Sequence, residues 1–266
     1  MDGDRVSNFF SETSSIPFEE LPTTVINGRA ILDEGTNLNP KAIYDNVTIY
    51  EIPNWTRGKN KQVKIPWPGI PYVILSAKLG REVRGIVKDT NALKERKDGK
   101  YKFPNQVALD IALKDRIVNL MIFKNSIKVS GGQKAEHIVE AFIFIKAVLT
   151  ALDRKNIKVF DKSPILTKVD VYMENVVFNL GYPIKKDVLR NKALESEIES
   201  PYEADAVRVL YPMGYNKAKG DPRYFNFRVL HTGNVIFSGN NRKEMKPYYE
   251  KFMEFIKTNE DCIRFY

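Results

Sequence analysis

Two stretches of this sequence repeat the same order of apolar and polar positions. They are MIFKNSIKVSGGQKAEHIVEAFIFIKAVL, which begins at Met121, and RVLHTGNVIFSGNNRKEMKPYYEKFMEFI, which begins at Arg228. In each, a short apolar stretch ends at a polar turn, a second apolar stretch follows, and that one ends at Gly132 or Gly239. Short apolar stretches bounded by turn residues and glycine are typical of strands, so each segment predicts a β-hairpin.

After each glycine, large apolar residues recur at spacings of four, three and four. They are Ile138, Phe142, Ile145 and Leu149 in the first segment, and Met245, Tyr249, Phe252 and Ile256 in the second. These spacings place four side chains on one face of an amphipathic helix. The two segments align without a gap over the turn, the glycine and the helix, which indicates an ancestral duplication.

The sequence upstream of each hairpin also follows one plan. A β-branched stretch predicts a strand, and a short segment with proline near its start then predicts a helix. A Pro-Tyr pair comes before a further apolar strand in both copies. The strand, helix and later strand are 23–27, 39–43 and 73–79 in the first copy, and 169–175, 183–189 and 206–210 in the second. Each copy is expected to be strand, helix, several antiparallel strands and helix, which is an α+β fold.

These patterns predict the domain organisation. We expect a flexible N-terminal tail, a first repeat with a charged loop insertion, a linker, a second repeat and a C-terminal tail. The expected ranges are 1–20, 21–152 with the insertion at 85–104, 153–164, 165–258 and 259–266. The insertion contains DTNALKERKDGKYK, which is typical of a solvated loop and less often of an arm that contacts DNA or a partner.

Composition narrows the partners and the compartment. The formal charge of +9, from 42 Lys and Arg against 33 Asp and Glu, favours polyanionic partners such as nucleic acid or anionic membrane. Cys262 is the only cysteine, so no internal disulfide forms and an intracellular location is expected. The longest apolar run, 141–152, contains Lys146 and is too short to cross a bilayer, so no membrane-spanning segment is expected.

The sequence has no pattern typical of catalysis. His137 and His231 have no Cys or His nearby at metal-ligand spacing, and each is expected at the surface. Cys262 has no neighbour that would activate its thiol. We therefore expect no enzymatic activity, no metal and no cofactor.

The order of the elements and the residue patterns within the repeats resemble those of the TATA-box-binding protein family over about residues 22–258. MIFKNSIKVSGGQK follows the family pattern of apolar-Ile-Phe, a small-residue turn, Lys-apolar-Val and glycine. Glu174-Asn175-Val176-Val177 is similar to the motif that opens the family's second repeat, and Pro183-Ile184 is similar to the start of its first helix. The loop insertion and the divergent sequence of the repeats resemble the versions of the family that large DNA viruses encode.

The resemblance implies a saddle with a pseudo-two-fold axis. Its curved antiparallel sheet would bind the minor groove of double-stranded DNA with the concave face and bend the duplex, while the helices form the convex face. It also implies promoter recognition of an AT-rich, TATA-like site in transcription initiation. The implied partners are a transcription factor IIB-like initiation factor and the RNA polymerase machinery, in the nucleus or at a viral replication site. The chain would bind DNA as a monomer, because the duplication already supplies two-fold symmetry.

The resemblance assigns base contacts and wedges to particular residues. Asn27 and Asn175 match two asparagines that donate to adenine N3 and thymine O2, although an asparagine at a strand edge can instead be satisfied by backbone. Phe123 matches an aromatic wedge that enters a base step, with Leu230 in the same position of the second copy. Tyr72 and Tyr202 are assigned as the partner wedges. Phe123 and Leu230 could alternatively belong to the core.

The remaining predicted DNA contacts follow from strand alternation and alignment. Alternation from Phe123 and Leu230 places four residues on the same face as these two, namely Val129, Gly131, Ile236 and Ser238. Val177 matches a further groove contact. Arg29 and Arg228 stand where an apolar residue is expected, and such cations favour a narrow groove more than a widened one.

Two classes of function remain open from sequence. One is a DNA-bending initiation factor, and the other is an interaction module of a transcription complex that has lost tight or sequence-specific DNA binding.

Overall fold

A computed structural model describes residues 17–52, 68–86, 105–162, 166–215 and 220–265. Most of the predicted insertion, 87–104, lies outside these residues. The chain divides into two compact units. We call Ile26–Val171 the α2 unit, and Met1–Val25 together with Tyr172–Tyr266 the α4 unit, after their longest helices. The unit boundaries fall inside two strands, so the ranges predicted for the repeats remain a prediction.

The α2 unit is an antiparallel sheet with two helices. Its strands follow the order β3-β2-β4-β5-β6-β1. In chain order the elements are β1 (Thr23–Leu32), α1 (Pro40–Asn46), β2 (Val73–Leu79), β3 (Glu82–Gly85), β4 (Val107–Ala112), β5 (Ile117–Ile122), β6 (Ser126–Gly132) and α2 (Ala135–Arg154). The predicted start of α1 is confirmed, because the Asn39 side chain accepts a hydrogen bond from the Ala42 N–H at 3.0 Å and Pro40 begins the helix.

The α4 unit repeats this plan with fewer strands. Its sheet has the order β7-β10-β9-β8, again antiparallel. The elements are a 3-10 helix (Phe18–Glu20), β7 (Leu166–Asn179), α3 (Lys186–Glu195), β8 (Ala206–Tyr215), β9 (Pro222–Leu230), β10 (Asn234–Gly239), α4 (Arg242–Thr258) and α5 (Glu260–Ile263). The helix expected at 183–189 begins only at Lys186, because the Ile184 and Lys185 N–H groups donate to His231 and Ile263 carbonyls instead.

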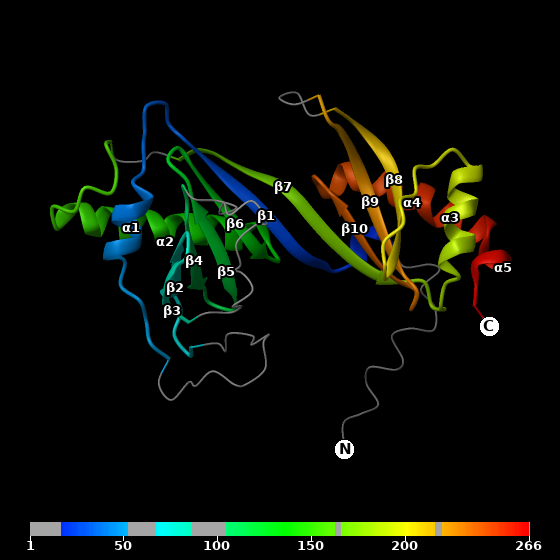
Figure 1. Ribbon diagram of the computed structural model, residues 1–266, viewed down its shortest axis with the longest axis horizontal. Coiled ribbons are helices and arrows are strands. Elements are labelled where there is room, and N and C mark those ends of the chain that lie inside the picture. The colour runs from blue at the N-terminus through cyan, green and yellow to red at the C-terminus, as the bar shows by residue number, and fades with distance from the viewer. Residues whose placement is uncertain (1–16, 53–67, 87–104, 163–165, 216–219, 266) are drawn as a thin grey trace, which may run out of the picture. The chain divides into compact units, whose positions relative to one another are not determined.

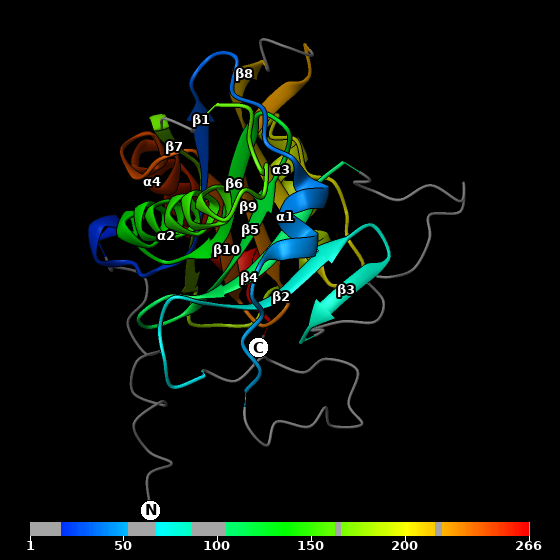
Figure 2. The same ribbon diagram turned by 90° about the vertical axis from the view of Figure 1, so that its left-hand side faces the viewer.

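In each unit the described helices pack on one face of the sheet. The four predicted helix positions of α2 are buried against β-strand residues of the same unit, and those of α4 likewise. Figure 1 shows α2 along its sheet, and Figure 2 shows α1 beside β2. A Cβ at Gly132 would lie 3.0 Å from Ile138, and one at Gly239 would lie 2.5 Å from Met245, so both strand ends need glycine for the helix to approach.

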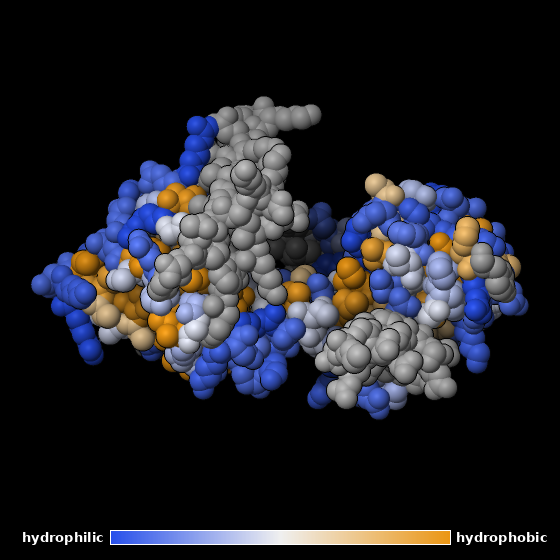
Figure 3. All heavy atoms as spheres, turned by 90° about the horizontal axis from the view of Figure 1, so that it is seen from below, coloured by the Kyte–Doolittle hydropathy of each residue, from blue (hydrophilic) through white to orange (hydrophobic). Residues whose placement is uncertain are grey.

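Some large apolar side chains remain at the surface of this fold. Figure 3 shows hydrophobic residues among hydrophilic ones on one face of the molecule. On α2, Val139 is 43% exposed and Ile143 is 62% exposed. Single exposed apolar residues are common, but two that are four apart on one helix form a shared patch.

The ends of the predicted tails belong to the core of the α4 unit, which corrects both tail predictions in part. Phe18 is 3% exposed and packs on Phe237 and Tyr249, with ring centroids 6.1 and 5.2 Å away. At the other end, Ile263 of α5 is fully buried and Arg264 pairs with Ile184 as an isolated bridge. The missed signal is burial of single apolar residues in short segments that are too short for a periodic pattern.

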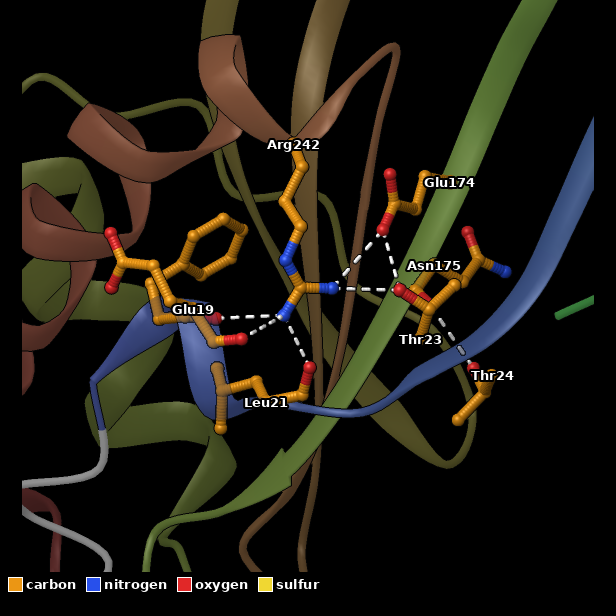
Figure 4. Close-up of polar contacts among 8 residues, drawn as sticks. Glu19, Leu21, Thr23, Thr24, Glu174, Asn175 and Arg242 are labelled. Atoms are coloured by element: carbon orange, nitrogen blue, oxygen red, sulfur yellow. Dashed lines mark hydrogen bonds and ion pairs between the residues drawn. The ribbon is translucent and has the colours of Figure 1, made fainter. Parts of the chain in front are cut away.

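Arg242 fixes the N-terminal segment in place (Figure 4). Its guanidinium donates to the carbonyls of Phe18 at 2.8 Å, of Glu19 at 3.2 Å and of Leu21. It also donates to the Glu174 carboxylate at 3.2 Å, and the Glu174 side chain is only 10% exposed. One side chain therefore satisfies three carbonyls and one partly buried charge.

We predict that Phe18→Ala lowers the free energy of unfolding by about 3 to 5 kcal/mol, because it leaves a cavity in an aromatic cluster. Phe265→Ala is the matched control; its side chain is 58% exposed. The control should change stability by less than about 0.5 kcal/mol. Urea titration followed by circular dichroism measures both, and equal effects of the two substitutions would show that residue 18 belongs to a tail.

Candidate nucleic-acid interface

The sheet face opposite the helices carries a row of polar side chains in the α2 unit. Paired residues of neighbouring strands point to the same face, so the pairing defines the row. Ser76 pairs with Asp110, Asp110 with Asn119, and Asn119 with Ser130. Asn27 lies beside the end of this row, since the Gly28 next to it pairs with Val129. The row crosses β2, β4, β5, β6 and β1.

The α4 unit carries the same row over three strands. Asn175 pairs with Ser238, Ser238 with Asn226, and Asn226 with Leu210. The order Asn, Ser, Asn on β7, β10 and β9 therefore repeats the order Asn, Ser, Asn on β1, β6 and β5. We call these two sets the polar rows. All six of their side chains are half-buried. Sequence reasoning predicted Asn27, Asn175 and Ser238 but missed Asn119, Asn226 and Ser130.

The asparagine amides of the polar rows have different partners. The Asn27 Oδ1 accepts a hydrogen bond from the Gly131 N–H at 3.3 Å, and the Asn226 Oδ1 accepts one from Arg208 Nε at 3.1 Å. The Asn119 Nδ2 donates to Asp110 at 3.1 Å. The Asn175 Oδ1 is buried and has no hydrogen-bond partner among the described residues. A buried amide oxygen without a donor is costly.

Asp110 is the main difference between the two rows. Its carboxylate accepts from Ser76 Oγ at 2.8 Å and is 8% exposed, whereas the paired position in the α4 unit is Leu210. A carboxylate repels phosphate. In a minor groove, the guanine N2 amine is the only base-edge group that can donate a hydrogen bond to it. The α2 row is therefore less suited to a pure A·T groove than the α4 row.

A second row of side chains lies beside each polar row and includes arginine and lysine residues. These cations lie on different strands in the two units. In the α2 unit Arg29 pairs with Lys128, on β1 and β6. In the α4 unit the paired cations are Arg208 and Arg228, on β8 and β9, and the place of Arg29 is taken by Val177. The predicted contacts Arg29, Val177, Arg228 and Ile236 all lie in this second row.

Carboxylates neutralise much of this positive charge. Arg228 forms ion pairs with Glu203 and Asp205, both at 2.7 Å. The hydrogen bond to Glu203, followed by the charge of Asp205, raises the pKa of the Arg228 guanidinium. Arg29, whose side chain is 45% exposed, lies 3.3 Å from Asp170. A phosphate or a groove would have to compete with these carboxylates for the two arginines.

The prediction that Val129 faces the open surface is wrong, and the turn explains why. Ile122 pairs with Ile127 across a turn of four residues, 123–126, whereas Val229 pairs with Val235 across five, 230–234. The extra residue shifts the second strand by one position, so Val129 is fully buried while Ile236 is half-buried. A one-residue shift in a strand moves every side chain to the other face.

Gly131 restores the common register after this shift. Between Ile26 and Gly28 on β1 the pairing with β6 jumps from Gly132 to Val129, which leaves one extra residue on β6. Gly131 has a φ of +92°, the left-handed conformation expected of a glycine bulge. Gly132 and Gly239 therefore keep equivalent places, which is why an alignment without a gap hides the change.

The structure separates the two wedges predicted for the α2 unit. Phe123 follows Ile122, which pairs with Val107, and its ring centroid lies 5.2 Å from Lys128 Nζ. The Tyr72 N–H donates to the Ala112 carbonyl at the opposite end of the same ladder. Five residue steps along β5 correspond to about 17 Å. Tyr72 is therefore not the partner of Phe123.

The two wedges predicted for the α4 unit lie at one end of its sheet. Leu230 pairs with Ala206, and Tyr202 forms an isolated bridge with the next residue, Val207. Leu230 is half-buried and Tyr202 is 50% exposed. A hydrogen bond to Asp187 raises the pKa of the Tyr202 hydroxyl. The roles of both residues in DNA binding remain predictions.

The histidines differ from expectation at one position. His231 is exposed as predicted, but His137 is 5% exposed because its Nδ1 accepts the Gln133 N–H at 3.0 Å and its Nε2 lies 3.0 Å from Asp115. His137 thus caps the start of α2. Within the described ranges no group of three or more metal-ligating side chains occurs. None of the described helices is long and apolar enough to span a bilayer.

Solved protein structures include similar folds. The chain is similar to the solved structure of Methanococcus jannaschii TBP, with 16% sequence identity and a TM-score of 0.48. The match covers 90% of this chain and 99% of that chain. No family model matches the sequence, and no curated protein matches it.

We predict that Gly131→Ala lowers the free energy of unfolding by about 1 to 2 kcal/mol, because alanine is strained at this positive φ. Ser130→Ala, at the preceding residue of the same strand, should change stability by less than about 0.5 kcal/mol. Thermal unfolding of both variants checks this. An unchanged stability of Gly131→Ala would show that β6 does not need the bulge.

Proposed function

We propose that this chain binds double-stranded DNA through the minor groove with the open sheet face of each unit. The polar rows carry this proposal. Amide and hydroxyl groups at matching places of two sheets suit a groove that offers mainly adenine N3 and thymine O2 acceptors. Half-buried apolar neighbours such as Val177 and Ile236 suit its sugar-lined walls.

The finer features of the proposal come from the sequence resemblance. We propose that the two units are tandem repeats of a saddle, that the bound duplex is bent, and that the site is an AT-rich promoter element. The proposed role is transcription initiation without enzymatic activity, inside the cell, with an initiation factor and RNA polymerase as partners. The similarity to viral versions of the family rests only on the loop insertion and on the divergent sequence.

A second candidate function is a protein-interaction module with weak DNA binding. Two observations favour it. Asp110 places a carboxylate in the α2 polar row, and Glu203 with Asp205 occupies Arg228. Both features reduce the attraction of the open faces for a polyanion.

We predict that the protein binds an AT-rich duplex more tightly than a GC-rich duplex of equal length, because the guanine N2 amine obstructs the asparagine donors. Replacing Asn27 and Asn175 together by Ala should reduce the ratio of the two affinities by about tenfold, or about 1.4 kcal/mol. Fluorescence anisotropy across a salt series measures both affinities.

Asn125→Ala is the matched control, because Asn125 is exposed in the hairpin turn. It should leave the ratio unchanged. Equal affinities of the unmodified protein for the two duplexes at physiological salt would contradict the DNA-reading proposal and favour the interaction module.

We also predict that Phe123→Ala reduces DNA bending more than Leu230→Ala, because a phenyl ring stacks on an unstacked base and leucine cannot. Energy transfer between dyes at the ends of a duplex of about 20 base pairs measures the bend. Binding without any shortening of the dye distance would show that neither residue acts as a wedge.

A further inference from the structure

The α2 unit has a cavity of about 600 Å³ beside α2. It lies between the second half of α2, the start of β2 and the segment 48–51. Most of its walls are apolar, and its charged lining residues are Glu51 and Lys155. A cavity of this size and lining suits one large apolar side chain with its neighbours. The side chains that form the α2 wall are Phe144, Val148, Ala151, Leu152 and Lys155.

Tyr72 forms the opposite wall in a strained conformation. Its φ is +58°, which is uncommon for a large side chain, and its N–H is held by the Ala112 carbonyl at 2.7 Å. Its ring lies 6.1 Å from that of Phe144 and remains 37% exposed. Residues held in such conformations concentrate at ligand-binding places. The tyrosine predicted as a DNA wedge thus belongs to this cavity.

An apolar ridge on the outer side of α2 leads into the cavity. It consists of Val139, Ile143, Ala147 and Ala151, each four residues from the next, and all four are exposed. Ala151 also lines the cavity, so the two features are continuous. Residues at this spacing form one row along a helix, here about 18 Å long.

The equivalent row on α4 is charged or polar. The same offset that aligns the two hairpins matches the ridge to Lys246, Glu250, Glu254 and Thr258. An outward helix row is normally polar, as on α4. The apolar row on α2 is therefore a specific feature of this unit and not a general property of the fold.

We infer that the ridge and the cavity together bind an amphipathic helix of a protein partner, which inserts one large apolar residue beside Tyr72. Such a helix would pack its apolar row along Val139–Ala151 and end over the cavity. At and just after that end of α2, the exposed cations Arg154, Lys155 and Lys158 outnumber the exposed carboxylates of Asp153 and Glu51. Charge complementarity therefore assigns acidic residues to the partner next to its anchoring residue.

This surface does not depend on DNA binding. The ridge lies on the outer side of α2, and α2 forms one wall of the cavity, whereas the polar row of the same unit lies on the sheet face opposite the helices. The peptide test can therefore fail while the DNA-binding proposal stands, and DNA binding can fail while the peptide binds.

The test uses three synthetic helical peptides of about 16 residues, long enough to cover the ridge. Each has leucines at four-residue spacing and two glutamates beside an anchor of Trp, Phe or Leu. Fluorescence anisotropy with the full chain should give a micromolar dissociation constant for at least one peptide. Ile143→Glu and Ala151→Glu should each weaken it by at least about tenfold.

Two controls separate a specific loss of peptide binding from effects of net charge and of unfolding. Lys257→Gln lowers the net charge on α4 and should leave the affinity unchanged. Replacing the glutamates of the peptide by lysines should weaken binding, and far-ultraviolet melting curves confirm that each variant is folded.

Three results would overturn the inference. One is the absence of binding of all three peptides up to millimolar concentration, and another is equal binding by Ile143→Glu. The third is a dimer in light scattering that Ile143→Glu dissociates, because the occupant of the ridge would then be a second copy of the chain.

Discussion

The packing of helices on only one face of each sheet is the constraint on which the rest of this structure depends. A sheet with both faces covered would need near-continuous apolar strands, whereas β5, β6, β9 and β10 alternate between fully buried and half-buried side chains. Only β2 and β4, towards the other edge of the α2 unit's sheet, are buried almost continuously among the described strands. The buried set packs on α2 or α4, with Gly132 and Gly239 permitting close approach. The half-buried set remains on the open face, and there the two polar rows occupy matching places.

The two units use this common plan differently. The α2 row continues through the buried Asp110 to Ser76 and has cations beside it on β1 and β6, whereas the α4 row continues to Leu210 and has cations beside it on β8 and β9. On the helix side, α2 exposes an apolar ridge where α4 exposes charges. Two sheets with the same strand pairing can carry different surfaces, because surface substitutions cost little stability.

Sequence patterns predicted many of the helices and strands, but local backbone geometry limited how well the site residues could be predicted. The β-branched stretch at 23–27 predicted the start of β1, the apolar run at 73–79 predicted β2, and apolar spacing predicted the buried faces of α2 and α4. Val129 was misplaced because turn length and a glycine bulge are compensating changes that no periodic pattern records. Tyr72 was misplaced because β4, and not β2, pairs with the hairpin. Asn119 and Asn226 could have been found, since they align at the offset of the hairpins.

Cysteine protection tests most directly whether the open faces bind DNA. In a Cys262→Ser background, Ser130→Cys and Ser238→Cys report on the two polar rows, and Ala147→Cys reports on the helix side. At a concentration of AT-rich duplex ten times the dissociation constant, alkylation at positions 130 and 238 should slow by about tenfold, with no change at position 147. Slower alkylation at position 147 alone, or no protection at 130 and 238 by a bound duplex, would contradict the account.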